Sequence, residues 1–387
     1  MEYIIRSDGT THSIKLGINA KKDTVLPSVR AAAAVGIGTS QKKDCLPKVS
    51  PEDPAFIIFT SGSTGKNKAV VLSEWNLISN LIDSAPLGYY SRDDIALGAL
   101  PLTHVFGLAL LTGALVLEYS IYFPEMISVP GLLDCIEREG ITRMNGVPSL
   151  YLAMADESEG RDLRSLRAGF IGGGPVTREQ FAYIEEKLGM TLISVYGMSE
   201  CIGISCASYQ DPRDVRASGV GPVYPMNRVR ILDECGQEVP TGKEGEILVN
   251  GPMRMLGYYG SPLTKEEFFP TGDLGYLDET GVLHLSGRKK EVIIRKGNNL
   301  SPLRIEEAFL SLPGIRTCVV VGLPDEKEGE IPAAMIVGTY DESALGNLLH
   351  KNELPAFVLP VESIPLTASG KPDKPKIKEI LLTCLNG

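Results

Sequence analysis

The 387-residue chain is 43% hydrophobic and 22% charged, a balance typical of a soluble globular protein of two or three domains with a sizeable core. Its net charge of −10 and its lack of a Lys/Arg-rich run argue against a nucleic-acid or anionic-membrane surface, although a few cations and backbone amides can still bind a phosphate ligand. Seven scattered cysteines without a CxxC pair, and only four histidines, disfavour a zinc site and predict reduced thiols in a cytoplasmic protein.

The N-terminal segment, residues 1–50, gives the weakest structural signal. Met1 to Asp8 contains an acidic residue and lacks an apolar core of signal-peptide length. Further along, the most apolar stretch is Gly107–Leu117, which is far shorter than the ~20 residues that a membrane-spanning helix needs. We therefore expect a soluble chain that does not act at a membrane.

Strands alternate with helices from residue 51 to about residue 215. Apolar runs of strand length, each followed closely by Gly, Pro or hydroxyl residues, occur at 55–59, 95–100, 168–171 and 192–195. Helical patterns lie between them at 72–81, 131–139 and 178–188, the first with Ser73 as its N-cap. The alternation predicts a mostly parallel sheet that helices cover on both faces, with 55–59 as a buried strand.

After about residue 215 the pattern changes to short strands separated by Gly, Pro and Asp turns, such as 246–249 and 281–285. This predicts a small, largely antiparallel unit. Beyond Lys290 a basic loop at 295–299 is followed by a helical pattern at 302–310 and strand patterns at 317–321 and 333–337. We predict three segments: a short N-terminal one (1–50), a ligand-binding domain (51–289) and a compact α+β domain (291–387).

The densest motif is a loop directly after the first predicted strand. It reads Thr60, Ser61, Gly62, Ser63, Thr64, Gly65, Lys66, Asn67 and Lys68. Glycines let the backbone approach an anion, hydroxyls and amides donate hydrogen bonds, and lysines supply positive charge. The loop is not a Walker A motif, because Thr60 stands where that motif needs Gly and Asn67 where it needs Ser or Thr. We interpret it as a phosphate-binding loop in preference to a solvated surface turn.

Four other segments carry weaker signals. The pentapeptide Tyr196–Glu200 follows a predicted strand and offers an aromatic face, a hydroxyl and a carboxylate, suited to a base, a phosphate and Mg²⁺. Asp273 follows Thr271-Gly272 and can bind ribose hydroxyls or simply form a turn. Gly287–Lys290 lies near the start of the last domain, and Lys371 alone reads as a solvated surface charge.

The order and joint spacing of these segments resemble the superfamily of adenylate-forming enzymes, which includes acyl- and aryl-CoA synthetases, peptide-synthetase adenylation domains and firefly-type luciferases. The matching segments, between about Pro51 and Lys374, are 60–68, 172–175, 196–200, 245–258, 271–273, 287–290 and 366–371. The resemblance implies an α/β fold: a large N-terminal domain with a mostly parallel, helix-covered sheet and a small β-rich subdomain, followed by a small mobile α+β domain.

By this resemblance the protein activates a carboxylic acid with ATP to an acyl-adenylate, releases pyrophosphate and passes the acyl group to a thiol. The 60–68 loop, through Thr60, Ser61, Gly62, Ser63, Thr64, Gly65, Lys66 and Lys68, would hold the β- and γ-phosphates. Gly173, Gly174 and Pro175 would border the adenine, and Tyr196, followed by Gly197, would pack against its ring. Asp273 would bind the ribose hydroxyls and Arg288 the ribose–phosphate region.

The resemblance also implies the catalytic groups. Ser199 would lie near the α-phosphate and Glu200 would bind Mg²⁺. Lys371 would be the mobile lysine that contacts the acyl carboxylate and the α-phosphate. Lys290 occupies the family's hinge between the two domains, although an exposed linker charge is the alternative.

The substrate is expected from Pro101–Gly107, which resembles the acyl- and aryl-CoA synthetase form of its motif. His104, together with Gly172, would lie beside the acyl pocket, with a core histidine as the alternative for His104. Amino-acid-activating members carry Phe-Asp at this motif, so its absence favours a fatty, aryl or other non-amino acid.

The N-terminal region departs from the family pattern, because only 59 residues precede Thr60 where the family has many more. CoA is the expected acceptor, with a carrier-protein phosphopantetheine or an amine as alternatives. A homodimer or a partner chain is expected to complete the site. A non-catalytic nucleotide-binding homologue is the remaining alternative.

Overall fold

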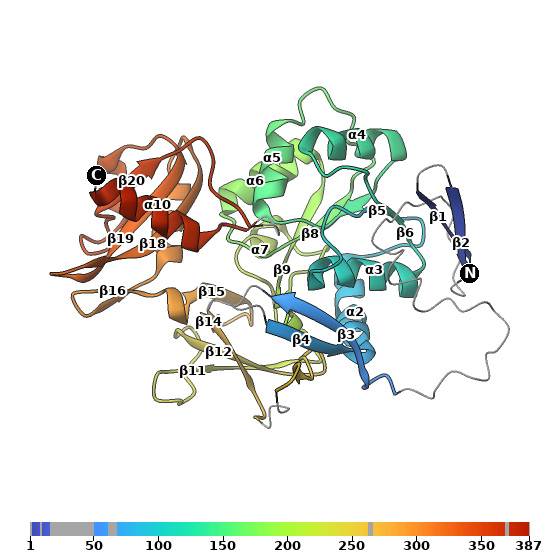
Figure 1. Cartoon of the computed structure of the whole chain (residues 1–387), viewed down its shortest axis with the longest axis horizontal. Coiled ribbons are helices and arrows are strands. Elements are labelled where there is room, and N and C mark those ends of the chain that lie inside the picture. The colour runs from blue at the N-terminus through green and yellow to red at the C-terminus, as the bar shows by residue number, and fades with distance from the viewer. Residues whose placement is uncertain are drawn as a thin grey trace.

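The computed structural model describes residues 2–7, 10–15, 50–60, 68–261, 266–367 and 371–386. Figure 1 shows a helix-covered sheet in the middle of the molecule, a β-rich unit below it and a C-terminal unit to one side. An antiparallel pair, β1 (Glu2–Ser7) and β2 (Thr10–Lys15), lies near the N-terminus. The phosphate-loop residues 61–67 lie outside the described residues.

The central sheet has six strands in the order β10-β9-β8-β7-β5-β6. The neighbours from β9 to β6 are parallel, and β10 runs antiparallel at one edge. The strands are β5 (Ile95–Leu97), β6 (Ser120–Tyr122), β7 (Arg143–Met144), β8 (Ala168–Ile171), β9 (Thr191–Met198) and β10 (Cys201–Cys206). The predicted mostly parallel sheet is confirmed.

Helices cover both faces of this sheet, as predicted (Figure 1). One core of buried side chains joins α4, α5 and α6 to the sheet, and α2 and α3 pack on the other side. The helices are α2 (Glu74–Gly88), α3 (Val105–Leu117), α4 (Val129–Glu139), α5 (Pro148–Asp156), α6 (Arg178–Leu188) and the short α7 (Arg213–Arg216). Ser73 caps α2 as predicted, since its hydroxyl accepts a hydrogen bond from the Asn76 amide at 3.2 Å.

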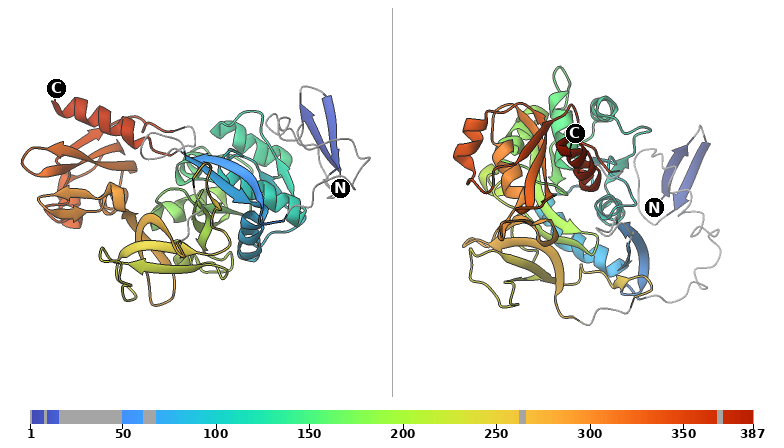
Figure 2. Two further views of the ribbon diagram at one scale, coloured as in Figure 1. Left: turned by 60° about the horizontal axis from the view of Figure 1, so that its bottom comes forward. Right: turned by 60° about the vertical axis from the view of Figure 1, so that its left-hand side comes forward.

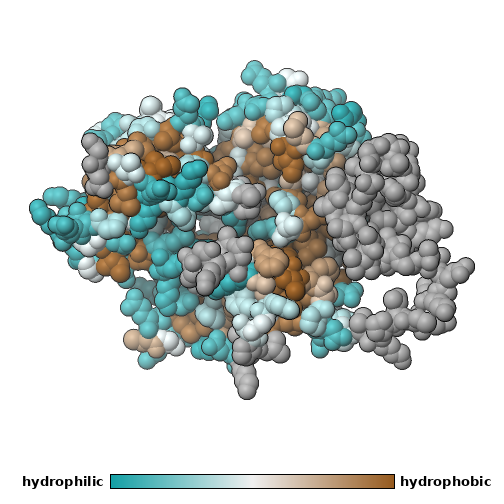
Figure 3. Space-filling model, in the orientation of Figure 1, coloured by the Kyte–Doolittle hydropathy of each residue, from teal (hydrophilic) through white to brown (hydrophobic). Residues whose placement is uncertain are grey.

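The first predicted strand is present as β3 (Pro54–Thr60), but it lies outside the parallel sheet and is not buried. It pairs antiparallel with β4 (Lys68–Ser73), which in turn pairs with β13 (Gly257–Tyr258). As an edge strand, β3 leaves Phe59 67% and Ile57 48% exposed, and Figure 3 shows a hydrophobic surface where β3 lies in Figure 1. The prediction of a buried strand was therefore wrong, because an apolar run indicates a strand without specifying its neighbours.

The β-rich unit is a four-stranded antiparallel sheet in the order β11-β12-β14-β15, which confirms the predicted change of pattern. Its strands are β11 (Arg228–Leu232), β12 (Gly245–Asn250), β14 (Phe269–Leu277) and β15 (Leu283–Arg288). The segment Thr271-Gly272-Asp273 lies within β14, so Asp273 does not simply form a turn. Gly272 has φ of +74°, a left-handed conformation that glycine tolerates, and the register of β12 with β14 shifts across this segment, as at a β-bulge.

The C-terminal unit follows a short 3₁₀ helix, η2 (Lys289–Glu291), and its described residues form five strands and three helices. The strands are β16 (Ile293–Arg295), β17 (Asn298–Leu300), β18 (Ile315–Asp325), β19 (Gly329–Gly338) and β20 (Phe357–Pro360). The helices are α8 (Pro302–Leu310), α9 (Glu342–Leu348) and α10 (Lys374–Asn386). The predicted helix at 302–310 is found with these bounds.

The C-terminal unit has its own apolar cores. Two clusters of buried side chains contain only residues from 293 onward, and four others contain only residues up to 283. Among the described residues, no buried apolar cluster joins the two parts, and Figure 2 shows the C-terminal unit as a separate lobe. No helix in the described part of the chain has the length and apolar content needed to cross a bilayer.

Candidate functional site

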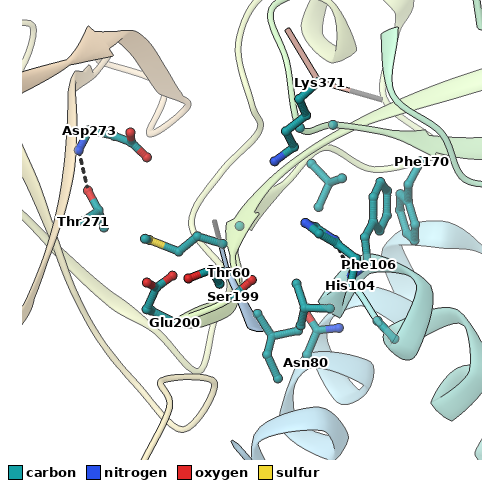
Figure 4. Close-up of a pocket in the computed structure, with 18 of the residues that line it drawn as sticks. Thr60, Asn80, His104, Phe106, Phe170, Ser199, Glu200, Thr271, Asp273 and Lys371 are labelled. Carbon is teal, nitrogen blue, oxygen red and sulfur yellow. Dashed lines mark hydrogen bonds between the residues drawn. The ribbon is translucent and has the colours of Figure 1, made fainter. Parts of the chain in front are cut away.

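A cavity of about 940 Å³ lies where the central sheet, the β-rich unit and the C-terminal unit meet (Figure 4). It brings together most of the predicted site residues that the structure describes. Those that line it are Thr60, Lys68, His104, Gly172, Gly173, Gly197, Ser199, Glu200, Asp273, Arg288, Lys290 and Lys371. Segments more than 300 residues apart in the chain therefore contribute to one cavity.

Lys371 enters this cavity from the C-terminal unit. Its backbone carbonyl accepts a hydrogen bond from the Thr367 amide at 2.8 Å, and Leu366 pairs with Pro372, so Lys371 lies at a hairpin-like bend. A Cβ placed on Gly173 would lie 3.8 Å from the lysine Nζ, and the glycine φ of +84° disfavours any side chain there. Burial, together with the nearby Arg288 guanidinium, lowers the pKa of Lys371, and Asp273 opposes that shift. The residue is therefore not the solvated surface charge of the alternative interpretation.

Ser199 and Glu200 follow β9 and face the cavity (Figure 4). Ser199 is buried, and Glu200 accepts a hydrogen bond from the Tyr258 hydroxyl at 2.8 Å. The Lys68 ammonium lies 4.8 Å from the centre of the same tyrosine ring, so a cation and a carboxylate flank Tyr258. One carboxylate and one hydroxyl fit a Mg²⁺ ion that takes its other oxygen ligands from phosphates and water. The described residues contain no cluster of three or more His, Cys, Asp or Glu side chains that would bind a metal alone.

Asp273 lies across the cavity on β14 and is almost fully buried. Its Oδ1 is 2.9 Å from Arg288 Nε, and its Oδ2 accepts a hydrogen bond from the Tyr196 hydroxyl at 2.7 Å. Because each carboxylate oxygen can accept two hydrogen bonds, Asp273 can still accept hydrogen bonds from the hydroxyl groups of a ligand. Arg288 and Tyr196 thus hold the carboxylate in place.

His104 caps α3, and its Nδ1 accepts a hydrogen bond from the Phe106 amide at 3.2 Å. Burial, and secondarily the Lys371 charge, lower the pKa of His104 to about 4, so the ring is neutral at physiological pH. Since Nδ1 accepts, the neutral ring carries its proton on Nε2 and can donate one hydrogen bond. The residue lines the cavity, as the predicted pocket position requires.

We expect His104 to make the folded state less stable as the pH falls from 6.5 to about 4. In this range the unfolded chain takes up a proton on this residue and the folded chain does not, so acid favours unfolding. His104→Gln removes this contribution, so the variant should gain stability relative to the original protein as the pH is lowered. Urea unfolding at pH 7 and pH 5 measures the difference. An equal pH dependence in the two proteins would contradict the assignment.

Several predicted residues do not line the cavity. Gly174 and Pro175 are exposed beside it, and Tyr196 is buried in the core with its hydroxyl on Asp273. Their predicted roles around adenine stay predictions. The remaining predicted residues lie outside the described part of the chain: Ser61, Gly62, Ser63, Thr64, Gly65 and Lys66.

Several polar residues of the cavity were not predicted, and Tyr258, Asn80 and Ser84 are among them. Tyr258 is the last residue of the matching segment 245–258. A phenol hydroxyl in a matching segment was the signal that could have identified it as a site residue. Asn80 and Ser84 lie four residues apart on α2, so both fall on one face of the helix. Helix α2 buries several other polar residues as well, so the sequence held no signal that singled out Asn80 and Ser84.

Comparison with known proteins supports the same assignment. An AMP-binding enzyme model matches residues 4–259, and an AMP-binding enzyme C-terminal domain model matches residues 304–371. The indoleacetate–CoA ligase of Aromatoleum aromaticum is 34% identical over 353 residues, which cover 87% of this chain and 69% of the relative.

Solved structures agree. ATP-bound MatB from Rhodopseudomonas palustris has a TM-score of 0.80 at 30% identity and covers 90% of this chain and 72% of its own. The o-succinylbenzoate CoA synthetase of Bacillus subtilis, in complex with ATP and magnesium, has a TM-score of 0.74 at 28% identity, over 86% and 70% of the two chains. With the site geometry above, these matches confirm the predicted resemblance: the chain belongs to the AMP-binding enzyme family.

Proposed function

We propose that the protein is an acid–thiol ligase that activates a carboxylic acid with ATP, releases pyrophosphate and transfers the acyl group from AMP to CoA. The observation that carries the proposal is the position of Lys371, which shares one cavity with Ser199, Glu200, Asp273 and Arg288. The lysine and arginine of this set can neutralise the phosphates of a nucleotide, and its carboxylates can bind a metal ion and hydroxyl groups. Relatives that are named CoA ligases support the thiol as acceptor.

In the first half-reaction, a substrate carboxylate oxygen forms a bond to the α-phosphorus, and the bond from that phosphorus to the β-phosphate oxygen breaks. A carboxylate is a weak nucleophile and the phosphate is already negative, so positioning and charge neutralisation supply most of the catalysis. Lys371 would donate hydrogen bonds to the carboxylate and the α-phosphate. Asp273 would hold the ribose hydroxyls, with Arg288 fixing its carboxylate. Mg²⁺, when bound at Glu200 and Ser199, would neutralise phosphate charge.

In the second half-reaction the thiolate forms a thioester bond and AMP leaves with the bonding electron pair. We propose that residues 291–387 rotate about Lys290, withdrawing Lys371 and opening a route for the thiol. Lys290 lies in η2 and lines the cavity beside Arg288, which fits a hinge close to the ligand. The proposal is restricted to CoA as acceptor because the relatives are named CoA ligases. A cytoplasmic location stays a prediction.

Acid-dependent release of pyrophosphate from ATP tests this proposal. The purified protein is incubated with ATP, Mg²⁺ and a panel of aliphatic, aromatic and amino acids, with and without CoA, and thioesters are identified by mass spectrometry. We expect pyrophosphate release that needs a non-amino acid and a thioester that needs CoA. ATP binding without any acid-dependent release would instead identify a non-catalytic nucleotide-binding protein.

A further inference from the structure

Two polar side chains on α2 face the cavity without a protein partner. Asn80 is 9% and Ser84 7% exposed, and both line the cavity. Among the described residues, neither side chain has a hydrogen-bond partner, whereas Asn76 on the same helix donates to two backbone carbonyls. Because both side chains open onto the cavity and make no hydrogen bond within the described protein, they can form hydrogen bonds with a ligand there.

Aromatic side chains form much of the cavity wall around this pair. They are Tyr90, Phe106, Tyr119, Phe170 and Tyr224. Figure 4 shows Asn80, His104, Phe106 and Phe170 on one side of the cavity, with Asp273 and Thr271 on the other. Aromatic walls offer flat apolar surfaces that suit a ring in offset-stacked or edge-to-face contact.

The charged residues of the cavity come from elements other than α2 and α3. Those that line the cavity are Lys68, Glu200, Glu246, Asp273, Arg288, Lys289, Lys290 and Lys371. None of the described lining residues on α2 or α3 is charged. Arg143 lies behind this wall, but its charge already faces the buried Asp94 carboxylate at 3.9 Å. It also stacks on the Tyr90 ring at 4.0 Å and donates to the Gly88 and Tyr89 carbonyls. A second carboxylate, a sulfonate or an ammonium group on the substrate would therefore be buried here without a counter-charge.

We propose that the substrate is an aromatic monocarboxylic acid with a neutral hydrogen-bonding ring substituent, such as a hydroxyl group, and that Asn80 and Ser84 bind this substituent. The proposal rests on the proposed function and narrows it to one class of acid. The carboxylate would face Lys371, and the ring would lie between the aromatic walls. The amide of Asn80 can donate to or accept from the substituent, and the hydroxyl of Ser84 can do the same.

Gly203 on β10 keeps Asn80 in its place. A Cβ on this glycine would lie 2.2 Å from Asn80 Oδ1 and 2.5 Å from Tyr224 Cε2, both too close for real contact. Tyr224 is fully buried and cannot yield easily, so an alanine at 203 would displace the Asn80 amide. The position of the Asn80 amide thus depends on the absence of a side chain on Gly203. In this proposal Asn80 is the residue that determines specificity for the ring substituent.

The test uses matched pairs of acids that differ by one ring hydroxyl: 4-hydroxycinnamate with cinnamate, 4-hydroxyphenylacetate with phenylacetate, and 4-hydroxybenzoate with benzoate. Hexanoate and malonate represent aliphatic acids and diacids. The kcat/KM for pyrophosphate release is measured for the original protein, Asn80→Leu, Ser84→Ala and, as a control on the exposed face of α2, Ile82→Ala.

In at least one pair, we expect the original protein to prefer the hydroxylated acid by about 10-fold or more, since a site built to bind a hydroxyl rejects the analogue that lacks it. Asn80→Leu should reduce this preference by about 10-fold, with little loss on the unsubstituted acid, and Ser84→Ala should reduce it less. Ile82→Ala should leave the preference unchanged. ATP affinity close to that of the original protein shows that each variant is folded. If Asn80→Leu fails to fold, Ser84→Ala provides the same comparison.

Three results would overturn the proposal and leave the proposed function intact: a preference for hexanoate or malonate, no preference within any pair, or an equal loss on both members of a pair in Asn80→Leu. In each of these three results the protein still releases pyrophosphate in the presence of an acid, as the proposed function requires. Absence of release with every acid in the panel would overturn the proposed function, and this inference with it.

Discussion

Lys371→Ala is expected to abolish adenylate formation while leaving acyl transfer from supplied acyl-adenylate largely intact. The ammonium group reaches the cavity from the C-terminal unit and lies next to Gly173, on the side of the cavity where the carboxylate and the α-phosphate would meet. Loss of one donor aimed at developing charge typically lowers the rate by about 10²–10³-fold, and loss of a full positive charge should cost at least this much. Transfer from a preformed adenylate needs no attack on phosphorus, so it should persist.

The two half-reactions are measured separately, by acid-dependent pyrophosphate exchange and by thioester formation from synthetic acyl-adenylate and CoA. Lys376→Ala is the control, since this lysine is exposed on α10 and outside the cavity. It should keep both activities. An equal loss of both half-reactions in Lys371→Ala would contradict the division of roles between adenylation and transfer.

Glu200→Gln is expected to lower kcat/KM for adenylation by about 10²–10³-fold, a range typical for the loss of one preorganised electrostatic group. The substitution preserves shape but removes the negative charge proposed to bind Mg²⁺. The Mg²⁺ concentration for half-maximal rate should therefore rise, as measured by titrating Mg²⁺ at fixed ATP.

Tyr258→Phe separates the charge of Glu200 from its positioning. This variant removes the hydroxyl that donates to Glu200 at 2.8 Å but keeps the ring beside Lys68. A net loss of about 1 kcal/mol, or roughly five- to tenfold in rate, is typical for one hydrogen bond. If Glu200→Gln left the Mg²⁺ dependence unchanged, or Tyr258→Phe matched its full effect, the assignment of Glu200 to the metal would fail.

Motif order predicted several residues that line the cavity. Asp273, Arg288 and Lys371 are far from the phosphate loop in the chain, and no local pattern indicates that they meet. Their joint spacing nevertheless matched one family, and the structure places all three in one cavity. Helix bounds were predicted best where both ends carry a capping signal, whereas α2, with a predicted cap only at Ser73, extends to Gly88 and not to residue 81 as predicted. Helix α6 begins after Thr177, which forms a capping box with Gln180, and ends at the left-handed Gly189.

The incorrect or missing predictions share a physical cause, since each depends on contacts between distant segments. The exposure of Phe59 follows from β3 being an edge strand, which an apolar run does not reveal. The contact of Tyr196 with Asp273 depends on β9 meeting β14. The role proposed for Asn80 depends on Gly203 in another sheet strand, so one helix in isolation could not indicate it.

The C-terminal unit and the rest of the protein have separate apolar cores, so polar contacts contribute much of the free energy that holds the two parts in one orientation. Gln180 donates to the Arg316 carbonyl at 3.2 Å, and the Arg316 guanidinium lies 3.9 Å from Asp156, with its side chain 75% exposed. Exposed polar contacts of this kind are weak and are screened by salt. Reorientation of the lobe therefore leaves its hydrophobic interior intact, and the charge of the bound ligand and the ionic strength should set the balance between orientations.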